Sequence, residues 1–273
     1  MSSRKSLLFP RALAAALAIA TAGLRAAPTK VSNGQAPPGT SGAPILAVPV
    51  SSFEVREASM AEALRKLRDS DVARVVIGFE RIPHAAGSRG VPITLSLRDT
   101  TVGGVVRRLC QADARYEYEV IKGQMVEVRP TWATADPRDL LNMRIRHYAI
   151  DADAEPEQVI TSVPEDAPEL RRFLARKRHR WAQEAGVSEG GSAGSILSGN
   201  MTPPRFSLNL RDVTVRQILD AISLKSIRMF ETGKYNAANG TPLRSGPVGW
   251  QYDFVLDPDA STGLGGYPSW KPF

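Results

Sequence analysis

Cysteine is nearly absent from this sequence. Cys110 is the single cysteine among 273 residues, so no disulfide can form within the chain. Cys110 lies beside the apolar stripe of an expected helix, which favours a small, partly buried residue; a reactive or intermolecular thiol is the alternative. The fold must therefore be held by its core, and 42% hydrophobic residues over this length suffice for one.

Histidine is also scarce, which bears on metal and acid–base chemistry. His84, His147 and His179 are the three histidines, and none has a second ligand at the spacing of a metal site. We expect surface or packing roles for them, and no metal or cofactor. Five acidic residues cluster near two expected helix starts: Glu155, Glu157, Glu165, Asp166 and Glu169. Carboxylates at a helix start interact favourably with the helix dipole, and we adopt this interpretation; paired acid–base catalysis is the alternative.

One short motif is typical of hydrolases. Residues 190–194 match the G-x-S-x-G pattern around Ser192, but a polar segment precedes them instead of a buried strand, and no histidine follows. A flexible Gly/Ser loop over 186–199 is the interpretation we adopt. The sequence thus nominates no catalytic residue and no small-molecule substrate, and we expect a protein that is not an enzyme.

Long apolar runs are missing except at the amino terminus. Arg4, Lys5 and Arg11 precede an apolar run over 12–20, and Ala20-Thr21-Ala22 fits a signal-peptidase site. We expect a cleaved leader over 1–22 and a periplasmic protein. An amphipathic or buried start, or an uncut attachment, is the alternative. The run is too short to span a bilayer core of about 30 Å, and with no cysteine after it we do not expect a lipid anchor.

Composition divides the rest of the chain. Three positive charges lie in the leader, so cleavage lowers the formal charge from +7 to +4. Residues 23–50 are rich in Ala, Pro and Gly and predict a linker. We expect a first domain over 51–131, a joint near 132–137, a second domain over 138–257 and a partly ordered tail over 258–273.

A repeat organises the two domains. Leu95-Ser96-Leu97-Arg98-Asp99 aligns without a gap with Leu208-Asn209-Leu210-Arg211-Asp212, and each segment predicts a strand, a turn and an amphipathic helix. The helix stripes are Val102, Val105, Val106, Leu109 and Val215, Ile218, Leu219, Ile222. Thr214 and Gln217 form a capping box. We expect the two aspartates to shape the turn; a repeated ligand site is the alternative.

Each domain is expected to be α+β. The expected order in the first domain is β-α-β-β-α-β-β. It begins with a strand around Phe53, a helix capped by Ser59 and Glu62, and a strand over 75–82. The repeat unit follows, and then a hairpin that turns at Lys122-Gly123. In the second, a strand over 143–150 and a helix from Pro156 precede an insertion. We expect Pro164 and Pro168 to stop that helix and Asp166 to cap the next.

This order of elements, with the L-x-L-R-D-x-T-V turn, resembles the short amino-terminal domain shared by secretins and TonB-dependent receptors (STN-like, secretin N0-like). The resemblance covers 53–129 well and the second domain mainly over 206–222. It implies a periplasmic, non-enzymatic docking module that contacts inner-membrane or regulatory partners. Because no barrel or pore segment follows the two domains, we expect docking and not a channel. A small sheet covered by two helices leaves a strand edge with unpaired backbone groups, which would suit such docking; flanking loops that cover this edge are the alternative.

A basic helix within the insertion is the strongest candidate site. Its cations are Arg171, Arg172, Arg176, Lys177, Arg178 and Arg180, and its apolar face is Leu170, Phe173, Leu174 and Trp181. Such a helix binds phosphates of lipids or nucleic acid, or an acidic protein face, unless it is only a solvated surface. We therefore expect an exported adaptor or accessory protein of an envelope assembly, such as a secretion or pilus-type system. The alternative is a polyanion-binding protein acting through residues 169–181.

Overall fold

Local signals start and stop the elements of the first half. The computed structural model describes residues 45–70, 75–85, 88, 90–185, 205–231, 247–256 and 266–273, all within one compact unit, Gly42–Phe273. The first half contains η1 (Ile45–Ala47), β1 (Pro49–Ala58), α1 (Met60–Arg68), β2 (Val76–Glu80), β3 (His84–Ala85), β4 (Ile93–Thr101), α2 (Val102–Ala112), β5 (Tyr116–Ile121) and β6 (Met125–Pro130). Ser59 and Glu62 form the expected capping box of α1.

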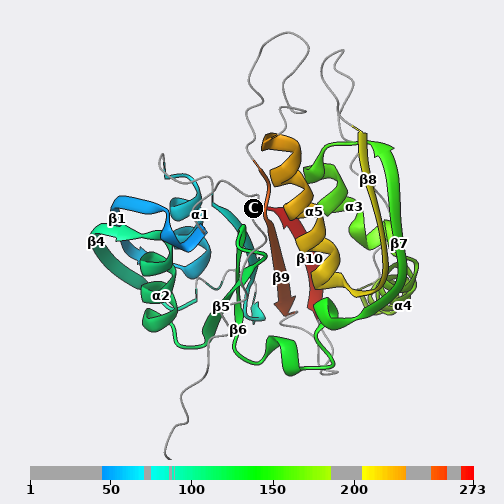
Figure 1. The fold of residues 1–273 in the computed structure, drawn as a ribbon. Coiled ribbons are helices and arrows are strands. Elements are labelled where there is room, and N and C mark those ends of the chain that lie inside the picture. The colour runs from blue at the N-terminus through cyan, green and yellow to red at the C-terminus, as the bar shows by residue number, and fades with distance from the viewer. Residues whose placement is uncertain are drawn as a thin grey trace, which may run out of the picture. The chain divides into compact units, whose positions relative to one another are not determined.

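The second half follows through a joint of 3-10 turns, η2 (Ala133–Ala135) and η3 (Leu140–Asn142). It contains β7 (Arg144–Asp153), α3 (Pro156–Asp166), α4 (Pro168–Ala185), β8 (Arg205–Thr214), α5 (Val215–Glu231), β9 (Trp250–Leu256) and β10 (Gly266–Pro272). Helices and mixed sheets together make an α+β fold, as the sequence predicts (Figure 1).

The repeat is present in both halves. The stripes of α2 and α5 named above are fully buried. Thr101 accepts the Gly104 N–H and Thr214 accepts the Gln217 N–H, so each threonine caps its helix. Asp99 and Asp212 have φ of 48° and 51°, in the left-handed region that aspartate tolerates, so both shape the turn as expected.

The repeat begins earlier than its sequence suggests. The N–H of Val102 donates to the carbonyl of Val48 at 2.9 Å, and that of Val215 donates to Met143 at 3.1 Å. Each accepting carbonyl follows a 3-10 turn, η1 or η3. The expected linker over 23–50 is therefore wrong at its end, because Ile45, Leu46 and Val48 pack on the first core.

Strands from both halves share one sheet. Its order is β10-β9-β2-β6-β5, with β3 beside β9, and β2 runs parallel to both β6 and β9. The antiparallel pairs β1–β4 and β7–β8 form two separate ribbons. The order of elements also differs between the halves: in the first half α1 is followed by the strand β2, whereas in the described residues of the second half α3 is followed by the helix α4. The sheet thus does not follow the expected division into two modules, because β2 pairs with strands of both halves.

The shared sheet has a core on each face. Successive residues of a strand point to opposite faces. Ile77 and Phe79 of β2 therefore pack with α1 and α2 in one core, while Val76 packs in the other with α3 and α5. Trp250 and Tyr252 of β9 join Val76 there. Every residue of β2 is buried, as expected for a strand covered on both sides.

The carboxyl-terminal expectation also changes. Residues 266–272 form β10, which pairs with β9, and Phe273 is 4% exposed beside Phe79. The expected end of the second domain at 257 is thus wrong, and the tail expected to be partly ordered contains a strand. The Trp270 ring packs against Tyr252 with the ring planes tilted by 48°, and this aromatic packing outweighs the Pro/Gly composition. Residues 1–44, 186–204 and 232–246, which hold the expected leader and Gly/Ser loop, lie outside the described residues.

Two helix boundaries differ from expectation. Pro164 lies inside α3 and does not stop it; the helix ends at Asp166. Asp166 does not cap α4, because that helix starts at Pro168 and the Asp166 carboxylate accepts instead from the Ser162 hydroxyl at 2.5 Å. Pro156 opens α3 at its first turn, as expected.

A substitution at Gly249 tests how closely the chain before β9 approaches β2 in the shared sheet. A Cβ at this position would lie 1.9 Å from the carbonyl oxygen of Ile77, a backbone atom that cannot move aside. We expect Gly249→Ala to lower the free energy of unfolding in urea by about 1–3 kcal/mol, as overpacked sites do. Ser52→Ala, at an exposed position of β1, is the control. Equal stability of the two variants would contradict the close approach of β9 to β2.

Candidate functional site: an apolar groove with a cationic rim

The expected basic helix is present as α4. Leu170 is fully buried and Leu174 nearly so, which fixes the first half of α4 against the second core. Arg171, Arg172 and Arg176 are exposed. The side chains of Lys177, Arg178, Arg180 and Trp181 lie outside the described residues. The described part of α4 therefore presents three cations on an exposed helix face.

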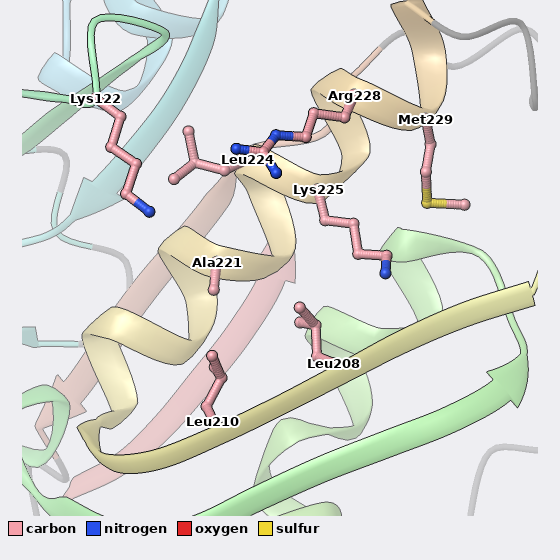
Figure 2. A pocket seen from close by; sticks show the side chains of 8 residues that line it. All are labelled: Lys122, Leu208, Leu210, Ala221, Leu224, Lys225, Arg228 and Met229. Carbon is pink, nitrogen blue, oxygen red and sulfur yellow. The ribbon is translucent and has the colours of Figure 1, made fainter. Parts of the chain in front are cut away.

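A second cationic surface combines residues far apart in the sequence. A groove of about 400 Å³ lies between β8 and α5 and is lined by Lys122, Leu208, Leu210, Ala221, Leu224, Lys225, Arg228 and Met229. Figure 2 shows Leu208 and Leu210 pointing from β8 toward α5. The floor is apolar, and the three charged residues that line it are all cations.

The groove depends on the length of α5. By the alignment of the repeat, α2 ends at the position equivalent to Lys225, whereas α5 continues to Glu231. The added turns carry Arg228 and Met229 past the end of the shared pattern. Lys122 comes from the turn between β5 and β6, where φ of 50° at Lys122 and 72° at Gly123 confirms the expected turn. Sequence reasoning missed this site because its cations are dispersed.

Lys225 connects the two walls of the groove. Its ammonium donates to the carbonyl oxygen of Ser207 on β8 and lies 5.3 Å from the centre of the Phe206 ring. A cation over an aromatic face is attracted by the ring quadrupole. Phe206 is fully buried, whereas Leu208 and Leu210 are only half-buried, so the apolar floor becomes more open along β8.

A buried group of carboxylates is the other place where chemistry could be sought. The Arg216 guanidinium of α5 donates to Glu127, to Glu80 at 2.6 Å and to Asp139 at 3.0 Å. The second oxygen of Glu127 lies 3.3 Å from Arg129. These contacts join α5 to β2, to β6 and to the joint before η3. We call these five residues the Arg216 network.

Burial changes the protonation of this region. It raises the pKa of Glu80 to about 7, against the attraction of Arg216, and it also raises the pKa of Asp139. Burial and the charge of Glu127 raise the pKa of Asp220 to about 8. The Asp220 carboxyl accepts a hydrogen bond from the Trp250 indole at 2.9 Å.

Carboxyl groups with shifted pKa values often mark active sites, but a catalytic group must also be accessible to a substrate. The side chains of Glu80, Glu127, Asp139 and Arg216 are each exposed by less than 10%. A substrate has no path to reacting atoms that solvent does not reach. We therefore interpret the Arg216 network as a structural connection between the halves.

The remaining sequence candidates have ordinary surroundings. His147 contacts Asn209 at 3.1 Å, and burial lowers the pKa of His84, whose ring contacts the Ile82 carbonyl. Burial raises the pKa of the half-buried Cys110 thiol to about 12, which disfavours the reactive thiolate. The side chain of His179 and the motif around Ser192 lie outside the described residues.

The acidic cluster is divided between helix ends. Glu155 and Gln158 form a capping box at the start of α3, with Glu157 in its first turn, and Glu169 lies in the first turn of α4. These three carboxylates match the expected dipole positions. Glu165 and Asp166 do not, because α3 extends to Asp166 and places them in its last turn.

Comparison with protein-family models, with curated proteins and with solved structures gives no match for this chain. In the part of the chain that the structure describes, no helix combines the length and apolar character needed to cross a membrane. Within the same residues, no group of three or more His, Cys, Asp or Glu side chains could hold a metal ion.

Removal of the central cation tests the Arg216 network. Arg216→Met leaves three buried carboxylates without their shared partner, so we expect the free energy of unfolding to fall by about 3–5 kcal/mol in urea titrations. Arg211→Met, at an exposed position of β8, is the matched control and should change stability little. A loss at Arg216 no larger than that at Arg211 would show that the network does not join the halves.

Asp220 gives a pH dependence with a definite sign. Its pKa in the folded protein, about 8, exceeds the ordinary value of 3.8, so the folded state keeps this proton to a higher pH than the unfolded state does. Its contribution to stability is complete below about pH 4 and is lost as the pH rises through about 8. Asp220→Asn keeps an oxygen acceptor for Trp250 and removes the titration.

We therefore expect the loss of unfolding free energy between pH 5 and pH 8.5, measured in urea, to be smaller in Asp220→Asn than in the wild type. Asp69→Asn, at an exposed carboxylate, is the control and should follow the wild type. Parallel curves for all three proteins would contradict a proton held on Asp220 in the folded state.

Proposed function

We propose that this chain is an exported, non-enzymatic docking protein that binds a protein component of an envelope assembly. The groove between β8 and α5 carries the proposal, because it combines an apolar floor with cations and lies beside a strand of a two-stranded ribbon. Binding sites for protein segments have this character: apolar contacts supply affinity, and charges at the rim supply orientation and rate.

The leader supports the place of action. The basic start, the apolar run and the Ala20-Thr21-Ala22 site are typical of a chain exported to the periplasm. The resemblance of the repeat to the short amino-terminal domain of secretins and TonB-dependent receptors supports the class of partner, an inner-membrane or regulatory component of a secretion or pilus-type system.

A second function has its own observation. Arg171, Arg172 and Arg176 are exposed on α4, and such a helix suits anionic lipid or nucleic acid. Contacts with phosphates weaken steeply as salt rises, whereas an interface with an apolar floor keeps much of its affinity. Export favours lipid over nucleic acid as the polyanion.

In-cell photo-crosslinking distinguishes these functions. A photoreactive amino acid is placed at Lys225 in the groove, at Arg176 on α4, and at Ser52 on β1 as a control, in the tagged full-length protein. We expect Lys225 to capture an envelope protein reproducibly, identified by mass spectrometry, and the mature chain to begin after Ala22.

The other outcomes are equally definite. Capture from Arg176 alone, of lipid or nucleic acid, would replace docking by polyanion binding. An uncut chain in the cytoplasm, or no protein captured from Lys225 and Arg176 beyond that from Ser52, would contradict the proposed function.

A further inference from the structure

We propose that β8 binds an extended segment of the partner, with acidic and apolar residues, as an additional strand. Before binding, the Lys225 ammonium occupies a backbone carbonyl at this edge of β8 and blocks strand pairing there. This inference rests on the proposed docking function and specifies how the groove is occupied.

The direction of the backbone groups of β8 is the first step. Among the described residues β8 pairs with β7 alone, so its other edge has no strand partner there. In an antiparallel strand the N–H and C=O of one residue point to the same side, and successive residues alternate. Because the Ser207 carbonyl receives the Lys225 ammonium from α5, Ser207, Asn209 and Arg211 direct their backbone groups to this edge.

The same alternation places the side chains. Leu208 and Leu210 lie between these residues and point toward α5, into the groove (Figure 2). A strand added to β8 in register would present every second side chain beside these leucines and over Leu224. An alternating segment with apolar residues on that face therefore fills the groove, as peptides do when they extend a sheet.

Charge specifies the remaining positions of the segment. Lys122, Lys225 and Arg228 line the groove, and the described lining residues include no carboxylate. Acidic side chains flanking the apolar ones would meet these cations at close range. A segment with basic residues at the same positions would be repelled, since juxtaposed like charges at an interface suppress binding of the wrong partner.

Lys225 has two roles in succession. In the free protein the Lys225 ammonium, which comes from α5, hydrogen-bonds to the Ser207 carbonyl of β8. Lysines and covering helices are devices by which proteins protect a strand edge from unwanted pairing. When the segment binds, its backbone N–H replaces the ammonium at that carbonyl, and the released ammonium pairs with a carboxylate of the segment. The exchange conserves the hydrogen bond and adds an ion pair.

The first half of the repeat does not offer the same site. The residue aligned with Lys225 is Ala112, whose methyl side chain can neither donate a hydrogen bond nor carry a charge. The aligned strand β4 therefore lacks a lysine at this position. Among the described residues, the second half brings together the strand edge, the apolar floor and the lining cations.

A defined peptide tests the inference. An eight-residue fluorescent peptide that alternates leucine and glutamate is titrated with the full-length mature protein, and binding is followed by fluorescence anisotropy. We expect Lys225→Glu to weaken binding by about tenfold. Arg107→Glu, which reverses an exposed helix cation of α2 outside the groove, is the matched control and should bind as the wild type does.

Two further measurements isolate the added strand. The same peptide N-methylated at alternate backbone nitrogens cannot donate to β8, so we expect it to lose binding. In the ¹⁵N-labelled protein, hydrogen exchange at the Asn209 and Arg211 N–H groups should slow on addition of the unmodified peptide. Equal binding of the methylated peptide, or unchanged exchange at both groups, would overturn the strand.

The remaining outcomes also decide. No binding up to about 1 mM peptide, the weakest affinity useful for recognition, would overturn the inference. Binding of phosphatidylglycerol vesicles that Lys225→Glu abolishes and Arg107→Glu does not, without peptide binding, would assign the groove to lipid. An envelope protein crosslinked in cells from Lys225, with no peptide binding, would refute the strand yet retain docking.

Discussion

The buried contact of Arg216 with its three carboxylates is the interaction on which the rest of the structure depends. Arg216 lies on a helix of the second half, whereas Glu80 and Glu127 belong to the first and Asp139 to the joint. A charge buried to this degree is tolerated only while its partners remain in place. The contact therefore fixes α5 against the shared sheet and, with α5, one wall of the groove.

The two roles of α5 explain how a repeat can acquire a new surface. One part of the helix repeats α2, with the same stripe and the same cap, and secures the core. The turns beyond the aligned region lengthen the groove wall, because they add Arg228 and Met229 to Ala221, Leu224 and Lys225 of the aligned part. The cationic helix α4, in contrast, is anchored by Leu170 and Leu174 and presents Arg171, Arg172 and Arg176 on its exposed face.

Sequence patterns predicted those parts of the fold that depend on residues close together in the chain. The buried stripes of α2 and α5, their threonine caps, and the turns at Asp99, Asp212 and Lys122 all follow from residues close together in the chain. The pairing of β2 with β9 could not be predicted, because it depends on residues far apart. A signal was present, however: Val75-Val76-Ile77-Gly78-Phe79 is apolar without alternation, which is typical of a strand covered on both faces.

The groove and the Arg216 network were missed for a related reason. Composition draws attention to the consecutive arginines of α4, whereas Lys122, Lys225 and Arg228 converge only in the fold. Composition also concealed η1 and β10, since Ile45 and Trp270 lie within segments rich in proline and glycine. In both cases a few apolar side chains with a place to pack outweighed the average character of their neighbours.

The parallel pair β2–β9 has a consequence for how the chain reaches its folded state. Gly78 pairs with Trp250, so the central sheet cannot be completed until the last part of the chain has emerged from the ribosome. Contacts of such sequence separation close slowly, because the entropy of a large loop is lost before the contact forms. Slow closure prolongs the unfolded interval, and an unfolded chain is the form that a general secretory channel threads across a membrane. For a chain exported as proposed above, the topology that unites the two halves thus also prolongs the form in which the chain can be threaded.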